Sequence, residues 1–144
     1  MRCLPRARRR GNLYQYSMPR PTVLLIEEDA FFSQIIKHAL EQRDLEVLWS
    51  SNGEEGVREA MTSKPTIIIL AVMIPKKNGF QVLEELKGHP ETREIPVIML
   101  TRMSLREDID RCLSSGACEY LIKTHHSPAD IVRRVERILN LTRP

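Results

Sequence analysis

Polar side chains follow several short apolar runs of this sequence, and their types suit the binding of a cation and a phosphoryl group. Glu27, Glu28 and Asp29 follow the first run, Thr101 ends the fourth, and Lys123 follows the fifth. Carboxylate oxygens bind hard divalent cations, and an ammonium or hydroxyl binds phosphoryl oxygens. Each residue alone has an ordinary explanation as a helix cap or a solvated side chain. Their joint placement after separate runs favours one shared site.

The third apolar run, residues 67–74 (IIILAVMI), brings no such side chain to its end. It holds Ala71, and a polar turn begins at Pro75. A methyl group has no nucleophilic oxygen and no metal-binding atom. The carboxyl ends of the strands are where an open α/β sheet usually has its ligand-binding or catalytic residues. At that position the third run has an alanine.

After residue 21, five apolar runs alternate with helical patterns. The runs are 23–26, 47–50, 67–74, 97–101 and 120–122. Near-continuous apolar strands are typical of a parallel sheet that helices cover on both faces. A (βα)5 pattern with short connections predicts an α/β three-layer sandwich with right-handed crossovers. Ligands bind such sheets at the carboxyl ends of the strands, where the polar residues above should converge.

Three helix starts have clear N-cap signals. Asn52 and Ser104 are each followed three residues later by a glutamate, and Ser127 is followed by Pro128 and Asp130. These spacings are those of side chains that cap the free N–H groups of a first helical turn. They predict where the second, fourth and fifth helices begin.

The formal charge of the chain is concentrated in its first 20 residues. Those residues contain six arginines and no acid, so that removing them changes the formal charge from +3 to −3 for residues 21–144. We expect residues 1–20 to be a disordered basic extension and residues 21–142 to form a single domain. A slightly acidic domain argues against a nucleic-acid-binding face on the fold itself.

Composition and motifs exclude several other classes. Cys3, Cys112 and Cys118 have no Cys-x-x-Cys spacing and are expected to be reduced thiols of a cytoplasmic protein. No apolar run reaches the roughly 20 residues that span a bilayer, and the basic start has no secretory apolar stretch after it. Neither a Gly-x-Gly-x-x-Gly motif nor a nucleotide-binding P-loop is present. We therefore predict neither a membrane protein nor a nucleotide-dependent enzyme.

Four segments together resemble the receiver domain of bacterial two-component response regulators. They are VLLIEED, IPKKNGFQVLEELK, IPVIMLT and GACEYLIK, in family order and at family spacing. The resemblance covers residues 22–141. It implies a flavodoxin-like fold with a parallel five-stranded sheet in the order 2-1-3-4-5.

The resemblance also implies roles for individual residues. Glu27 and Glu28 match the acidic pair that binds Mg2+ in the family, together with the backbone carbonyl of Met73. Ala71 falls on the phosphoacceptor aspartate. Because an alanine cannot form an acyl phosphate and supplies no oxygen to the metal, we expect no phosphorylation there, no required cofactor and at most weak Mg2+ binding.

Three further positions match the family's switch apparatus. Thr101 matches the hydroxyl of the fourth strand, Tyr120 the aromatic that changes rotamer on activation, and Lys123 the lysine of the fifth strand. Without an acceptor carboxylate, Lys123 should pair permanently with Glu27 or Glu28 and hold one conformation. Three residues depart from the family pattern. Arg102 replaces the small residue beside the switch hydroxyl, Thr124 stands where a proline usually follows the lysine, and Asn78 replaces the aspartate that commonly precedes the glycine of the turn.

The resulting functional prediction is a single-domain receiver in phosphorelay signal transduction that acts through protein–protein contacts and is not an enzyme. A histidine kinase or a downstream signalling protein is the expected partner, and a homodimer through residues 105–141 is a further expectation.

Three alternatives stay open. Phosphorylation could fall on Glu28 or Asp29, an ordinary receiver could have been engineered from Asp to Ala at position 71, or the basic extension could bind nucleic acid.

Overall fold

A computed structural model describes residues 20–102 and 105–142 as five strands that alternate with five helices. The strands are β1 (Thr22–Ile26), β2 (Glu46–Ser50), β3 (Ile67–Ala71), β4 (Val97–Thr101) and β5 (Glu119–Ile122). The helices are α1 (Ala30–Glu41), α2 (Gly53–Ser63), α3 (Gly79–Gly88), α4 (Arg106–Ser114) and α5 (Pro128–Thr142).

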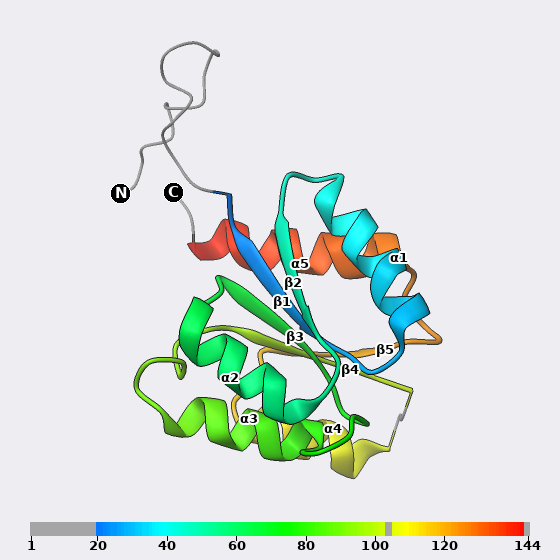
Figure 1. The fold of residues 1–144 in the computed structure, drawn as a ribbon. Coiled ribbons are helices and arrows are strands. Elements are labelled where there is room, and N and C mark those ends of the chain that lie inside the picture. Colours follow the sequence, from blue (N-terminus) through cyan, green and yellow to red (C-terminus); the bar gives the residue numbers. More distant parts are fainter. Residues whose placement is uncertain (1–19, 103–104, 143–144) are drawn as a thin grey trace.

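The strands form one parallel sheet in the order β2-β1-β3-β4-β5, which confirms the predicted topology (Figure 1). The register places Ile26 beside Leu70, Ala71 beside Leu100, and Thr101 beside Ile122. The carboxyl ends of β1, β3, β4 and β5 are therefore level with one another. Residues directly after these strands must lie close together.

Helices cover both faces of the sheet (Figure 1). On one face, α1 and α5 bury alternate strand residues such as Leu25 and Ile69. On the other face, α2, α3 and α4 bury the intervening residues, such as Leu24 and Ile68. Because side chains alternate across a strand, burial on both faces requires the continuous apolar runs seen in the sequence.

The third strand is shorter than predicted. The apolar run 67–74 predicted a strand of that length, but β3 ends at Ala71. Val72 and Ile74 remain buried because the loop packs into the core on the α2, α3 and α4 face. Beyond Ala71, the apolar pattern therefore predicted burial correctly but wrongly predicted that the residues pair with a neighbouring strand.

Two of the predicted N-caps are confirmed. Asn52 accepts the N–H of Glu55 at 2.9 Å, and the Ser127 hydroxyl accepts the N–H of Asp130 at 3.1 Å. The predicted cap Ser104 lies outside the described residues, and α4 has Leu105 at its N-cap without a side-chain bond.

The predicted basic extension also lies outside the described residues, apart from Arg20. Among residues 20–102 and 105–142, no helix combines the length and apolar character that crossing a bilayer requires.

Candidate functional site

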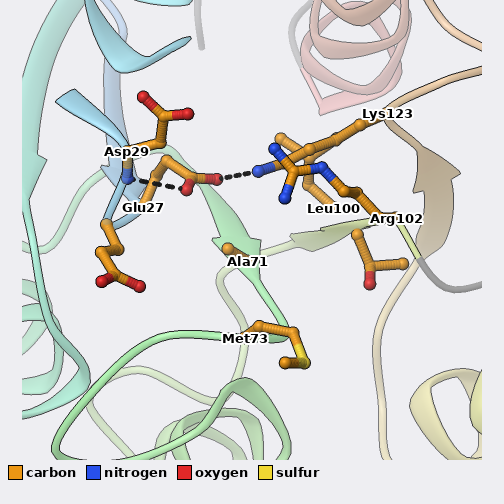
Figure 2. Close-up of a pocket in the computed structure, with 9 residues that line it drawn as sticks. Glu27, Asp29, Ala71, Met73, Leu100, Arg102 and Lys123 are labelled. Carbon is orange, nitrogen blue, oxygen red and sulfur yellow. Dashed lines mark hydrogen bonds and ion pairs between the residues drawn. The ribbon is translucent and has the colours of Figure 1, made fainter. Parts of the chain in front are cut away.

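A cavity of about 640 Å³ opens at the carboxyl ends of the strands. Figure 2 shows side chains from the ends of β1, β3, β4 and β5 around this space. The lining residues are Glu27, Glu28, Asp29, Ala71, Met73, Leu100, Thr101, Arg102 and Lys123. The structure thus brings together every predicted site residue except Tyr120.

An ion pair between Glu27 and Lys123 crosses the cavity (Figure 2). Lys123 Nζ lies 2.7 Å from Glu27 Oε1, and the exposed fractions of the two side chains are 12% and 3%. The other carboxylate oxygen, Oε2, accepts the backbone N–H of Asp29 at 3.0 Å. The predicted pairing of the lysine is therefore formed with Glu27, whose carboxylate has a partner on each oxygen.

Two aromatic residues that the sequence reasoning did not single out for the site support this ion pair. The Trp49 indole N–H donates to the backbone carbonyl of Glu27 at 2.8 Å. The Lys123 ammonium lies 4.5 Å from the centre of the Phe32 ring, a cation–π distance. Phe32 packs against the core, whereas its neighbour Phe31 is 76% exposed. Because consecutive helical positions point in different directions, only one of these two phenylalanines faces the core.

Ala71 forms part of the cavity wall at the end of β3, and it is almost fully buried. The N-terminus of α3 packs against it: the N–H of Gly79 donates to the Val72 carbonyl at 2.8 Å. A Cβ atom on Gly79 would come within 2.4 Å of the Ala71 carbonyl oxygen. Glycine is therefore required at this close approach, which holds the end of β3 in place.

Thr101 and Tyr120 interact with each other. Thr101 is buried at the cavity wall, and Tyr120 packs against the core on the α2, α3 and α4 face. Burial raises the pKa of Tyr120, and a hydrogen bond with the Thr101 side chain opposes that rise. The two predicted switch residues are thus linked in this structure.

The remaining acids of the cavity do not complete a cation site. Glu28 and Asp29 are exposed, and Asp29 caps α1 by accepting the N–H of Phe32 at 3.1 Å. Within residues 20–102 and 105–142, no three His, Cys, Asp or Glu side chains gather as metal ligands. Because Glu27 is already bound to an ammonium and Ala71 has no oxygen to offer, the side chains present do not fit Mg2+.

The Arg102 side chain extends from the end of β4 toward the same space as Lys123 (Figure 2). It is exposed, and it has no ion-pair or hydrogen-bond partner within the part of the chain that the structure describes. At the rim of the cavity, none of the described residues therefore engages the guanidinium donors of Arg102.

The family model of the response regulator receiver domain matches residues 23–136 of the 144-residue chain. The chain belongs to the response regulator receiver family. The matched residues of this receiver lie within residues 21–142, which the sequence predicts to form one domain.

Two curated relatives of the receiver are transcriptional regulators. The DNA-binding dual master transcriptional regulator RpaA of Synechocystis is 32% identical over 123 residues, which is 85% of this chain and 49% of RpaA. The phosphate regulon transcriptional regulatory protein PhoB of Escherichia coli is 30% identical over 122 residues, which is 85% of this chain and 53% of PhoB. The receiver thus spans about half the length of these relatives.

A solved structure has the same fold. The receiver domain of the Francisella response regulator 1452 superposes with a TM-score of 0.79 and 26% identity, covering 86% of this chain and all of that one. This likeness agrees with the flavodoxin-like topology seen here.

Proposed function

We propose that this receiver does not accept a phosphoryl group at the end of β3 and that it signals through contacts with other proteins. The observation that carries the proposal is Ala71, which lines the cavity beside Lys123 and Thr101. Phosphotransfer from a histidine kinase needs a carboxylate oxygen that attacks phosphorus in line. A methyl group cannot perform this step.

The proposal includes independence from Mg2+. The carboxylate of Glu27 is held by Lys123 at 2.7 Å and by the N–H of Asp29 at 3.0 Å. A metal ion would have to displace the ammonium from a buried carboxylate, which costs a strong charge-assisted interaction. The Met73 carbonyl and the exposed Glu28 do not compensate for that loss.

The same ion pair supports a single conformation. In the proposed function, position 71 has no carboxylate that could compete with Glu27 for Lys123. A ligand shifts a conformational equilibrium only by binding one state better than the other. Partner proteins, and not phosphorylation at position 71, then govern this receiver.

Exposed apolar side chains support protein contacts. Leu105, the N-cap of α4, and Leu113 within α4 are 60% and 45% exposed, and both lie in the predicted contact region 105–141. Phe31 on α1 is a third exposed apolar residue. A histidine kinase, a downstream signalling protein and a second copy of the chain are the proposed partners. A non-enzymatic role and a cytoplasmic location remain predictions.

The test is the intact mass after incubation with acetyl phosphate and Mg2+, for this chain and for Ala71→Asp in parallel. We expect only the Asp variant to gain a phosphoryl group, because it restores the missing nucleophile next to Lys123. Modification of the unaltered chain would overturn the proposal, and Glu28→Gln and Asp29→Asn would then test these two carboxylates as acceptors. If neither protein gains mass, the cavity has lost phosphotransfer for reasons beyond Ala71, and the protein-contact role stands alone.

A further inference from the structure

The side chain of Lys87 joins two loops at the amino-terminal edge of the sheet. Its ammonium, on the last turn of α3, donates to the backbone carbonyls of Arg93 at 3.0 Å and Ile95 at 2.9 Å, in the segment that leads into β4. Gly116, between α4 and β5, packs on the aliphatic stem: a Cβ atom there would lie 3.1 Å from Lys87 Cγ and 3.2 Å from Cε. The nitrogen is therefore held in place by contacts from two loops.

The acceptors around Lys87 match a neutral amine in number and charge. Both are uncharged carbonyls, and within residues 20–102 and 105–142 no carboxylate forms an ion pair with this lysine. An ammonium has three N–H donors and no lone pair, whereas a neutral amine has two N–H donors and one lone pair. Two carbonyls can bind both N–H groups of the neutral amine and leave its lone pair free.

Burial also favours the neutral form of Lys87. The residue is half-buried, and removal from water lowers the pKa of its ammonium, because a charge loses more hydration than a neutral amine does. The Cys118 thiol and the Glu94 carboxylate oppose this shift. Because burial raises the pKa of Cys118 in turn, that thiol is mainly uncharged near neutral pH. Lys87 therefore has a larger neutral fraction than an ordinary lysine.

We propose that Lys87 is an acyl-acceptor site, which takes a small acyl group from an acyl thioester without an enzyme. The Nζ lone pair attacks the thioester carbonyl carbon. A C–N bond forms, the C–S bond breaks, and the thiolate leaves with that electron pair and takes up the proton that the nitrogen releases. The product is an uncharged amide with one N–H group.

The site is separate from the proposed function. Lys87 lies near the end of α3 and contacts the segment before β4, whereas Ala71 is at the carboxyl end of β3, the opposite edge of the sheet. An acetyl group on an amine and a phosphoryl group on a carboxylate also differ in mass. The outcome at Lys87 therefore leaves the phosphorylation test at position 71 unaffected.

Acylation should loosen the segment between α3 and β4. The amide can donate to only one of the two carbonyls, and the charge that strengthens both contacts is lost. Within this segment the Thr92 N–H donates to the His89 carbonyl at 3.1 Å, and the Ile95 N–H donates to the Thr92 carbonyl at 3.0 Å. Both N–H groups should open to solvent more often once Lys87 no longer ties the segment to α3.

The first test is acetylation by S-acetyl-N-acetylcysteamine, a small acyl thioester, followed by the masses of proteolytic peptides. Lys77 is the internal control: its side chain is 34% exposed, and its ammonium is bound to the Glu85 carboxylate at 2.7 Å, an ion pair that loss of a proton would break. We expect the initial rate at Lys87 to exceed that at Lys77 by about threefold or more.

The same measurement in the urea-unfolded chain shows whether the fold causes the preference. There the rates at Lys87 and Lys77 should agree within about twofold, because burial and the specific contacts are gone. Equal rates in the folded chain would overturn the inference. A preference for Lys87 that persists in urea would overturn it as well, since it would come from neighbouring residues in the sequence.

The variant Cys118→Ser separates direct attack from a relay. Cys118 is exposed and acts electrostatically on Lys87, and a thiol can exchange with a thioester and pass the acyl group on to an amine nearby. Direct attack predicts that Cys118→Ser keeps the preference for Lys87. A rate at Lys87 that falls to that at Lys77 in this variant would overturn direct acylation.

Hydrogen exchange tests the structural consequence. Lys87→Gln replaces the ammonium by an uncharged amide, as acylation does, and should speed the exchange of the Thr92 and Ile95 N–H groups about tenfold. Lys77→Gln is the matched control and should leave both exchange rates within about twofold of those of the unaltered chain. Exchange in Lys87→Gln and in the acetylated chain that is no faster than in the control would refute the proposed loosening.

Discussion

Removing the Lys123 ammonium by Lys123→Met should destabilise the fold strongly. The Glu27 carboxylate is 3% exposed. After the substitution, the backbone N–H of Asp29 remains as its hydrogen-bond donor among the described residues. Breaking a buried ion pair by removing one partner typically costs about 3–5 kcal/mol, because an uncompensated charge stays buried. Lys123 is itself 12% exposed, so water can reach the vacated space and we expect the lower end, about 3 kcal/mol.

The reciprocal change, Glu27→Gln, should cost less. The Lys123 ammonium then keeps its contact with the Phe32 ring and its partial access to water. We expect a loss of about 1–2 kcal/mol. The double variant has neither charge and should lie within about 1 kcal/mol of the unaltered chain, so the two substitutions should be strongly non-additive.

Urea denaturation at pH 7 measures these differences, with the fluorescence of the single tryptophan as the signal. Trp49 is a suitable reporter because its indole donates to the Glu27 carbonyl and so senses the site directly. The exposed pair Lys37–Glu41 is the matched control, since both side chains are more than a third exposed and Lys37→Met should cost under about 0.5 kcal/mol. Additive effects of the two site substitutions, or a Lys123→Met cost no larger than that of Lys37→Met, would refute the reasoning.

Two other predictions follow from the packing. Gly79→Ala should destabilise the fold by roughly 2 kcal/mol, because its Cβ would lie 2.4 Å from the Ala71 carbonyl oxygen. The control Gly88→Ala would bring its Cβ within 4 Å of no other atom, and it should be neutral or stabilise the fold by about 0.5 kcal/mol. Equal urea midpoints for the two variants would contradict this prediction. Burial, with Asp108 nearby, raises the pKa of the Cys112 thiol to about 11, so that at pH 8 roughly one thiol in a thousand is ionised. In a Cys3→Ser background, a disulfide reagent should therefore modify the exposed Cys118 first and Cys112 only as the pH rises toward 11 or the chain unfolds; native Cys112 that reacts as fast as Cys118 at pH 8 would show that the burial argument is wrong.

Local pattern predicted the strands well where burial and pairing coincide. The apolar run 97–101 matches β4 residue for residue, because β4 is buried on both faces along its whole length. The run 67–74 overshot, because Val72 and Ile74 are buried in a loop and not in the sheet. Apolar character reports removal from water, whereas a strand also requires backbone partners, which the sequence does not display.

By itself, the sequence determined the order of the elements, the sheet edge that carries the site, and the alanine at the end of β3. These follow from periodicity and chain order, which are local properties. Only the tertiary structure decided that Lys123 pairs with Glu27 and not with Glu28, that Trp49 and Phe32 support that pair, and that Arg102 faces the same cavity without a partner in the described chain. Each of these contacts depends on the direction and the burial of a side chain once distant strands lie side by side. Glu27 and Glu28 are adjacent and of the same type, so the sequence does not show which of them Lys123 contacts.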